Sequence, residues 1–168
     1  MAAKKAVSEV TSIERVLETF PKLQIASKIL NEESDKLNQS ADGFNAALKK
    51  LGLGITSWYA FEEGKDENAA YSWSKEIGYT KISSKWGLAI RTISHDWSYP
   101  EPDVETWTFA DASRLLRIKA APHIPDLLEK LLDDATRVAK EVSKHAGHID
   151  VLTETILSMA HEPSKEPS

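Results

Sequence analysis

The residues best suited to bind a ligand gather around one predicted strand. Aromatic rings interleaved with arginine can stack nucleotide bases or hold an anion. The alternative is structural, with Trp86 in the core, Arg91 as a sheet-surface residue, and Arg114 and Arg117 paired to neighbouring acids such as Asp111. The sequence therefore predicts either a small-molecule or nucleotide site or an ordinary sheet surface, formed by Trp86, Arg91, His95, Trp97, Arg114 and Arg117.

No comparable pattern indicates catalysis or a bound metal. The chain has no cysteine, and it contains neither a GxSxG nor an HExxH motif. Gly52 and Gly54 lack the spacing of a phosphate-binding loop and instead favour the end of a helix. We therefore predict no catalytic residue, no metal and no cofactor. A small hydrolase with an unrecognised acid pair is the remaining enzymatic alternative.

The strongest pattern is a heptad repeat of apolar residues near the C-terminus. They fall at alternating intervals of three and four, and only His145 interrupts them, as a polar position that we expect to set register. This spacing predicts a long helix that packs against another helix as in a coiled coil. The C-terminal heptad stripe comprises Leu128, Leu131, Ala135, Val138, Val142, His145, Ile149, Leu152, Ile156 and Met159.

The first 51 residues are also predicted to be helical. Residues 5–19 carry apolar side chains at helical spacing, and Pro21 predicts a kink or a restart because proline lacks an amide hydrogen. The helix that follows has a row of large apolar residues seven apart and a second row of mostly small ones, and we expect it to lie against the C-terminal helix. The large row is Leu23, Leu30, Leu37, Phe44 and Leu51.

Between these helical segments the periodicity changes to the alternation of a β-sheet. Strands are predicted over 55–62, 71–82, 85–95 and 104–109, with Ser83 and Ser84 as a tight hairpin turn. Residues 111–118 are predicted to form a helical turn capped by Asp111 or Ser113. One face of the sheet is apolar and should be covered by helices: Tyr71, Trp73, Ile77, Tyr79, Trp86, Leu88, Ile90, Trp107 and Phe109.

Composition narrows the classes of partner and the compartment. The formal net charge of −5 gives no general attraction to nucleic acids or anionic membranes. The absence of cysteine suits a reducing compartment, and no run approaches the roughly 18 apolar residues of a membrane span. We therefore expect a cytoplasmic protein.

Together these elements predict an α+β fold, a four-stranded antiparallel meander flanked by N-terminal helices and a long C-terminal heptad helix. We expect one domain over residues 1–160, divided into a helical segment (1–51), a sheet (55–110) and C-terminal helices (113–160), with a disordered tail (161–168). The leading hypothesis is a non-enzymatic assembly protein whose helices bind a second copy or another helical protein. The alternative is a small-molecule or nucleotide-binding domain that uses the Trp and Arg residues.

Overall fold

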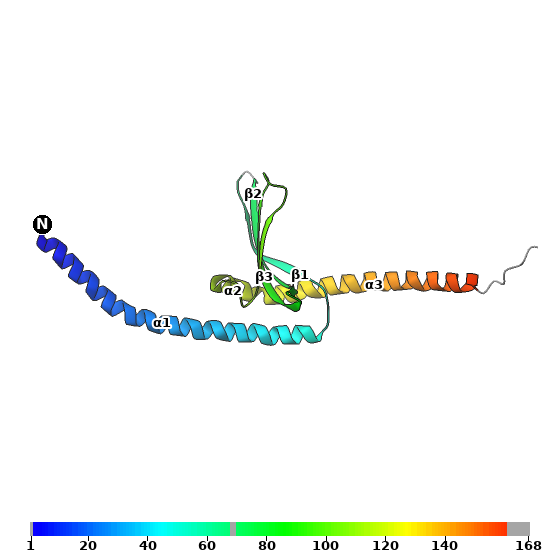
Figure 1. Cartoon of the computed structure of the whole chain (residues 1–168), viewed down its shortest axis with the longest axis horizontal. Helices are drawn as coiled ribbons and strands as arrows, with labels where there is room; N and C mark the ends of the chain where they lie inside the picture. The colour runs from blue at the N-terminus through cyan, green and yellow to red at the C-terminus, as the bar shows by residue number, and fades with distance from the viewer. Residues whose placement is uncertain (1, 68–69, 161–168) are drawn as a thin grey trace, which may run out of the picture. The chain divides into compact units, whose positions relative to one another are not determined.

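The computed structural model describes residues 2–67 and 70–160 and has the predicted α+β architecture (Figure 1). The chain divides into two compact units, residues 1–50 and 51–168. The single domain over 1–160 stays a prediction, and the proposed disordered tail lies outside the described residues. None of the helices in the described ranges is both long and apolar enough to span a bilayer.

The first unit is one α-helix, α1 (Ala2–Lys50), which runs through Pro21 without a break. The predicted restart at this proline is therefore wrong. A proline inside a helix costs about 3 kcal/mol, and strong helix formers flank it here, including the Glu18 and Lys22 ion pair across the proline. The helix ends as predicted, with Gly52 just beyond it in the left-handed region (φ 60°).

The second unit contains a four-stranded antiparallel sheet in the order β1-β2-β3-β4. The predicted strands are confirmed to within a few residues at their ends. Ser83 and Ser84 both have positive φ and join Ile82 to Lys85, which are paired directly, so the turn has the two-residue form that suits a twisted hairpin. The strands are β1 (Ser57–Lys65), β2 (Tyr71–Ile82), β3 (Lys85–Asp96) and β4 (Asp103–Thr108).

Strand register places the predicted apolar residues on one face, which we call the helix-covered face. Ile77 pairs with Ile90, and Ile90 pairs with Trp107, so their side chains share this face. Its centre is buried together with two leucines of the following helix, Leu127 and Leu131. The covering layer consists of α2 (Arg114–Ala120), the short 3-10 helix η1 (Ala121–His123) and α3 (Ile124–Ala160).

Polar contacts hold the covering layer to the edge strand β1. Ser57 is buried and donates a hydrogen bond to Asp134 of α3, with 2.7 Å between the oxygens. Lys119 of α2 forms an ion pair of 3.1 Å with Glu62, which also pairs with Lys75. The two lysines lower the pKa of the Glu62 carboxyl below its ordinary value by hydrogen bonding to its charged form.

A bulge in β1 adds an aromatic contact to the same junction. The pairing with β2 shifts between Ala60 and Glu62, which leaves Phe61 as the extra residue. Tyr59 and Phe61 both stack on the ring of His123, with centroid distances of 6.0 and 5.7 Å. The ring stacking thus fixes η1 against β1, and the hydrogen bond of Ser57 with Asp134 fixes α3 against the same strand. The predicted cap before α2 is also confirmed, because the Ser113 side chain accepts from the amide of Leu116.

Asp134 gives the fold a testable dependence on pH. Hydrogen bonds from Ser57 and then Lys130 lower the pKa of its carboxyl in the folded chain. A lowered folded pKa stabilises the fold above the ordinary aspartate pKa of about 3.9, and this stabilisation is lost as the pH falls through the folded value. Asp134→Asn should therefore lower the free energy of unfolding by about 1 kcal/mol at neutral pH.

Urea denaturation of both proteins at neutral pH and near pH 3 measures this contribution. The difference between the wild type and Asp134→Asn should shrink at the lower pH, because the Asp134 carboxyl of the unfolded wild type binds a proton there more readily than that of the folded chain. A difference that is the same at both values would contradict the assigned role of the charge.

Candidate functional site

The sheet separates Trp86 of the predicted ligand set from Arg91 and His95. Trp86 lies on the helix-covered face and stacks on Tyr79, with ring centroids 5.6 Å apart. Arg91 and His95 are an odd number of residues along the same strand, so they project from the opposite face, which we call the Arg91 face. Trp86 therefore does not share a site with them.

The other two arginines belong to the helical layer. Arg114 and Arg117 lie on α2, whose Lys119 binds Glu62 on the helix-covered side of β1. Arg91 projects from the other side of the sheet. The structure thus brings Arg91 and His95 onto one face, and it leaves Trp86, Arg114 and Arg117 on the other side of the sheet.

On the Arg91 face, Arg91 is already engaged by residues that the sequence prediction did not include. Its guanidinium contacts the carboxylate of Glu76 at 2.6 Å and lies 4.1 Å from the ring centre of Trp58. Ser74 donates to the other carboxylate oxygen of Glu76. The positive charge of Arg91 is therefore neutralised within the sheet, and this cluster stabilises the sheet surface more than it attracts an anion.

Trp58 occupies its position because of a glycine on the neighbouring strand. Trp58 and Gly78 are paired across β1 and β2, and a Cβ atom at Gly78 would lie 2.3 Å from the Trp58 ring. The same packing of a tryptophan on a glycine occurs on the helix-covered face, where a Cβ at Gly64 would lie 2.8 Å from Trp73. Each face of the sheet thus has one tryptophan lying flat over a glycine.

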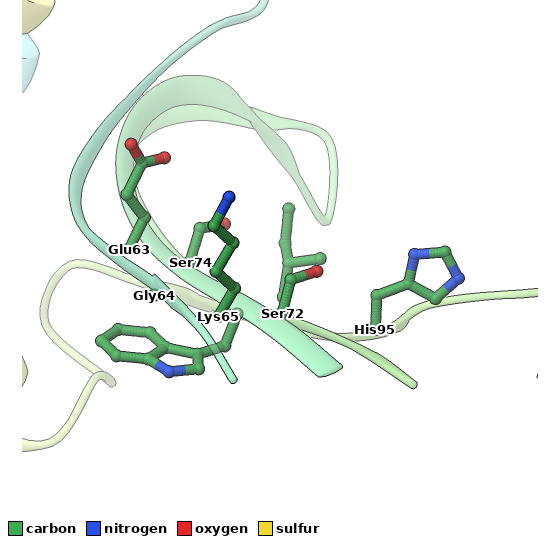
Figure 2. Close-up of a pocket in the computed structure, with 8 residues that line it drawn as sticks. Glu63, Gly64, Lys65, Ser72, Ser74 and His95 are labelled. Carbon is green, nitrogen blue, oxygen red and sulfur yellow. The ribbon is translucent and has the colours of Figure 1, made fainter. Parts of the chain in front are cut away.

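Beyond the ion pair of Arg91 and Glu76, the Arg91 face is hollowed into a groove of about 530 Å³. Its floor is formed by two serines of β2, and its walls come from β1 on one side and β3 on the other. Figure 2 shows the labelled polar side chains rising from one side of the strands. We call this hollow the sheet groove. The side chains that line it on this face are Glu63, Lys65, Ser72, Ser74, Ile93 and His95.

The cross-strand register arranges these residues in two rows. Lys65, Ser72 and His95 form the outer row, because Ser72 pairs with both of the others. The inner row is Glu63, Ser74 and Ile93. The ring of His95 contacts that of Trp97 in a tilted arrangement, with centroids 4.0 Å apart and an interplanar angle of 37°, which supports the imidazole at the edge of the groove.

The C-terminal heptad stripe occupies two environments along α3. Leu131 is buried in the core, and Val138 is half-buried, whereas Leu128 is already 38 % exposed. Beyond Val138 the residues of the stripe are exposed, so the sheet does not cover them. These are Val142, Ile149, Leu152, Ile156 and Met159, together with His145.

No group of three or more histidine, aspartate or glutamate side chains in the described ranges is arranged to hold a metal ion. His145 and His148 of α3 are both exposed. Residue patterning alone missed Trp58, Glu76, Lys65 and Ser72, because none belongs to a motif and each acquires its neighbours only through strand pairing.

The fold and surface define an α+β protein: an antiparallel meander with helices over one face, a polar groove on the other and a long, partly exposed amphipathic helix. Comparison with known proteins finds no matching family model, no matching curated protein and no matching solved structure.

Proposed function

We propose that this protein is a non-enzymatic assembly protein that self-associates through the C-terminal heptad stripe. The observation that supports the proposal is the exposure of the stripe beyond Val138, where Val142 is 62 % exposed. Large apolar residues at heptad spacing gain about 25 cal/mol for each Å² that a partner helix removes from water. A helix that needed only to cover the sheet could end near Val138.

A second copy of the chain is the partner that the residues themselves favour. A heptad repeat packs best against another heptad repeat, and α3 supplies one in every copy. The positions that flank the stripe on one side are small, so a second helix can approach closely and the apolar face is wider than a two-residue seam. These flanking residues are Ala139, Ala146, Thr153 and Ala160. The absence of cysteine favours the cytoplasm as the site of assembly.

The alternative function, small-molecule or nucleotide binding by the predicted Trp and Arg residues, has less support. Arg91 is neutralised by Glu76, and Trp86 lies on the opposite face. Another helical protein is the alternative occupant of the stripe, and measuring self-association distinguishes it from a second copy.

The test is light scattering coupled to size exclusion over a series of concentrations. The wild type should approach twice its 18.7 kDa mass or more as concentration rises. Val142→Asp places a charge in the stripe and should raise the dissociation constant about tenfold or more. Because Val142 is exposed within the chain, the Val142→Asp variant should have the same thermal unfolding temperature as the wild type when both are measured in the dissociated state.

Val151→Asp is the matched control for this experiment. Val151 is on the same helix and is 61 % exposed, but it lies outside the stripe. The control should therefore associate like the wild type. A wild type that stays monomeric at every concentration, or equal effects of the two substitutions, would refute self-association through this stripe.

A further inference from the structure

We propose that the outer row of the sheet groove, Lys65, Ser72 and His95, is a binding site for a phosphate group. The inference is independent of the assembly proposed for α3, because the groove lies on the sheet and uses none of the stripe residues. It also differs from the ligand set predicted from the sequence, with which it shares only His95.

The cross-strand pairing places the three residues of the row side by side. The three residues lie on adjacent strands and are direct partners, Lys65 with Ser72 and Ser72 with His95. Neighbouring strands are about 4.8 Å apart, so the three side chains stand in a line across the sheet. The middle residue has the shortest side chain, which leaves a recess between the longer lysine and histidine.

The polar groups of Lys65 and Ser72 are not used by the rest of the described chain, and His95 interacts electrostatically with the neighbouring carboxylate of Asp96. Neither Lys65 nor Ser72 has a hydrogen bond or an ion pair with another described side chain. Ser74, one row further in, differs because its hydroxyl already donates to Glu76. The ring of His95 contacts that of Trp97 in a tilted arrangement, and its nitrogens have no hydrogen bond to another described residue.

The donor set favours phosphate over a carboxylate or a metal ion. A phosphate group presents three acceptor oxygens that are not coplanar, and a lysine ammonium, a serine hydroxyl and an imidazole can each donate to one of them. A planar carboxylate is better matched by the fork of an arginine, and Arg91 is committed to Glu76. A lysine in the row opposes a cation.

The remaining groove suits the organic part of a phosphate monoester. Ile93 offers an apolar wall, and Glu63 at the far side accepts a hydrogen bond from a hydroxyl or an amine. In Figure 2, the Glu63 carboxylate and the His95 ring lie at opposite ends of the drawn side chains. A cavity of about 530 Å³ is large enough for such a molecule, so both a monoester and free phosphate are sources of the group.

The experiment follows the backbone amide signals of the isotope-labelled full chain by NMR during titration with inorganic phosphate and, separately, with phenyl phosphate. Both probes should shift the amides of Ser72 and His95. Tighter binding of phenyl phosphate, with an added shift at Ile93, would identify a monoester as the ligand class. Equal affinities with no shift at Ile93 would identify free phosphate.

Two variants and a matched control decide whether the row is responsible. Lys65→Gln and His95→Gln should each weaken binding of both probes about tenfold or more, because each removes a charged or strong donor. Lys85→Gln removes the same charge from the same face at the other end of β3 and should bind like the wild type. The proposal would be overturned if the wild type showed no saturable shifts with either probe. It would also be overturned if Lys65→Gln and Lys85→Gln lost the same amount of affinity.

Discussion

Replacing Leu131 with alanine should lower the free energy of unfolding by about 2 to 5 kcal/mol, the range found for leucine truncations in packed cores. Leu131 is 2 % exposed and, with Leu127, anchors α3 to the helix-covered face of the sheet. Truncation removes apolar contacts and leaves a cavity that the rigid sheet cannot fill. Urea denaturation followed by tryptophan fluorescence measures the change, because the five tryptophans all lie in the sheet region.

The neighbouring leucine provides the control for this prediction. Leu132 is 67 % exposed, so Leu132→Ala should change the free energy of unfolding by no more than about 0.5 kcal/mol. Similar losses from the two substitutions at a concentration where the protein is monomeric would mean that α3 does not meet the sheet along the Leu131 side.

Gly78→Ala should destabilise the chain by about 3 kcal/mol, at the upper end of the usual cost of overpacking. The added Cβ would lie 2.3 Å from the ring of Trp58 and 2.8 Å from the carbonyl oxygen of Ser57. The ring can move only by giving up its contact with Arg91, and the oxygen belongs to the backbone of β1. Thermal and urea denaturation should both report the loss.

A double-mutant cycle separates the two clashes. In a Trp58→Ala background, Gly78→Ala should cost less than in the wild type, because the contact with the ring is removed while that with the Ser57 backbone remains. Gly147→Ala is the control in a helix, where a Cβ meets no other atom within 4 Å and should stabilise by up to about 1 kcal/mol. Purely additive effects of Trp58 and Gly78 would show that the ring does not pack on the glycine.

Most of the fold could be predicted because its signals are local. Alternation of apolar residues marked all four strands, and the positions of Ser83 and Ser84 marked the hairpin. The continuous helix through Pro21 could not be predicted, because the cost of one proline competes with the stability of turns on both sides of it.

The candidate site was harder to predict from the sequence than the fold, because strand pairing brings its residues together. The two-residue turn at Ser83 and Ser84 sets the register of β2 and β3, so the pairing of Glu76 with Arg91 was in principle available from the sequence. The pairing of Lys65 with Ser72 was not. The bulge in β1 shifts the register by one residue, and nothing in the sequence marks its position.

The heptad stripe illustrates a different limit of sequence patterning. Leu131 and Val142 belong to the same repeat, yet the first is buried and the second is exposed. The repeat specifies which side of α3 is apolar and not which part of that side the chain itself covers. The length of the sheet beneath α3 determines where the packing of α3 on the sheet ends.

The two edge strands have a consequence for aggregation. The open edge of a sheet can recruit a strand from another molecule, which is how ordered aggregates begin. Here β1 is interrupted by its bulge, and β4 is only six residues long, carries the acids Asp103 and Glu105 and follows two prolines. The bulge, the short length and the charges of these edges all discourage the recruitment of a strand from another molecule.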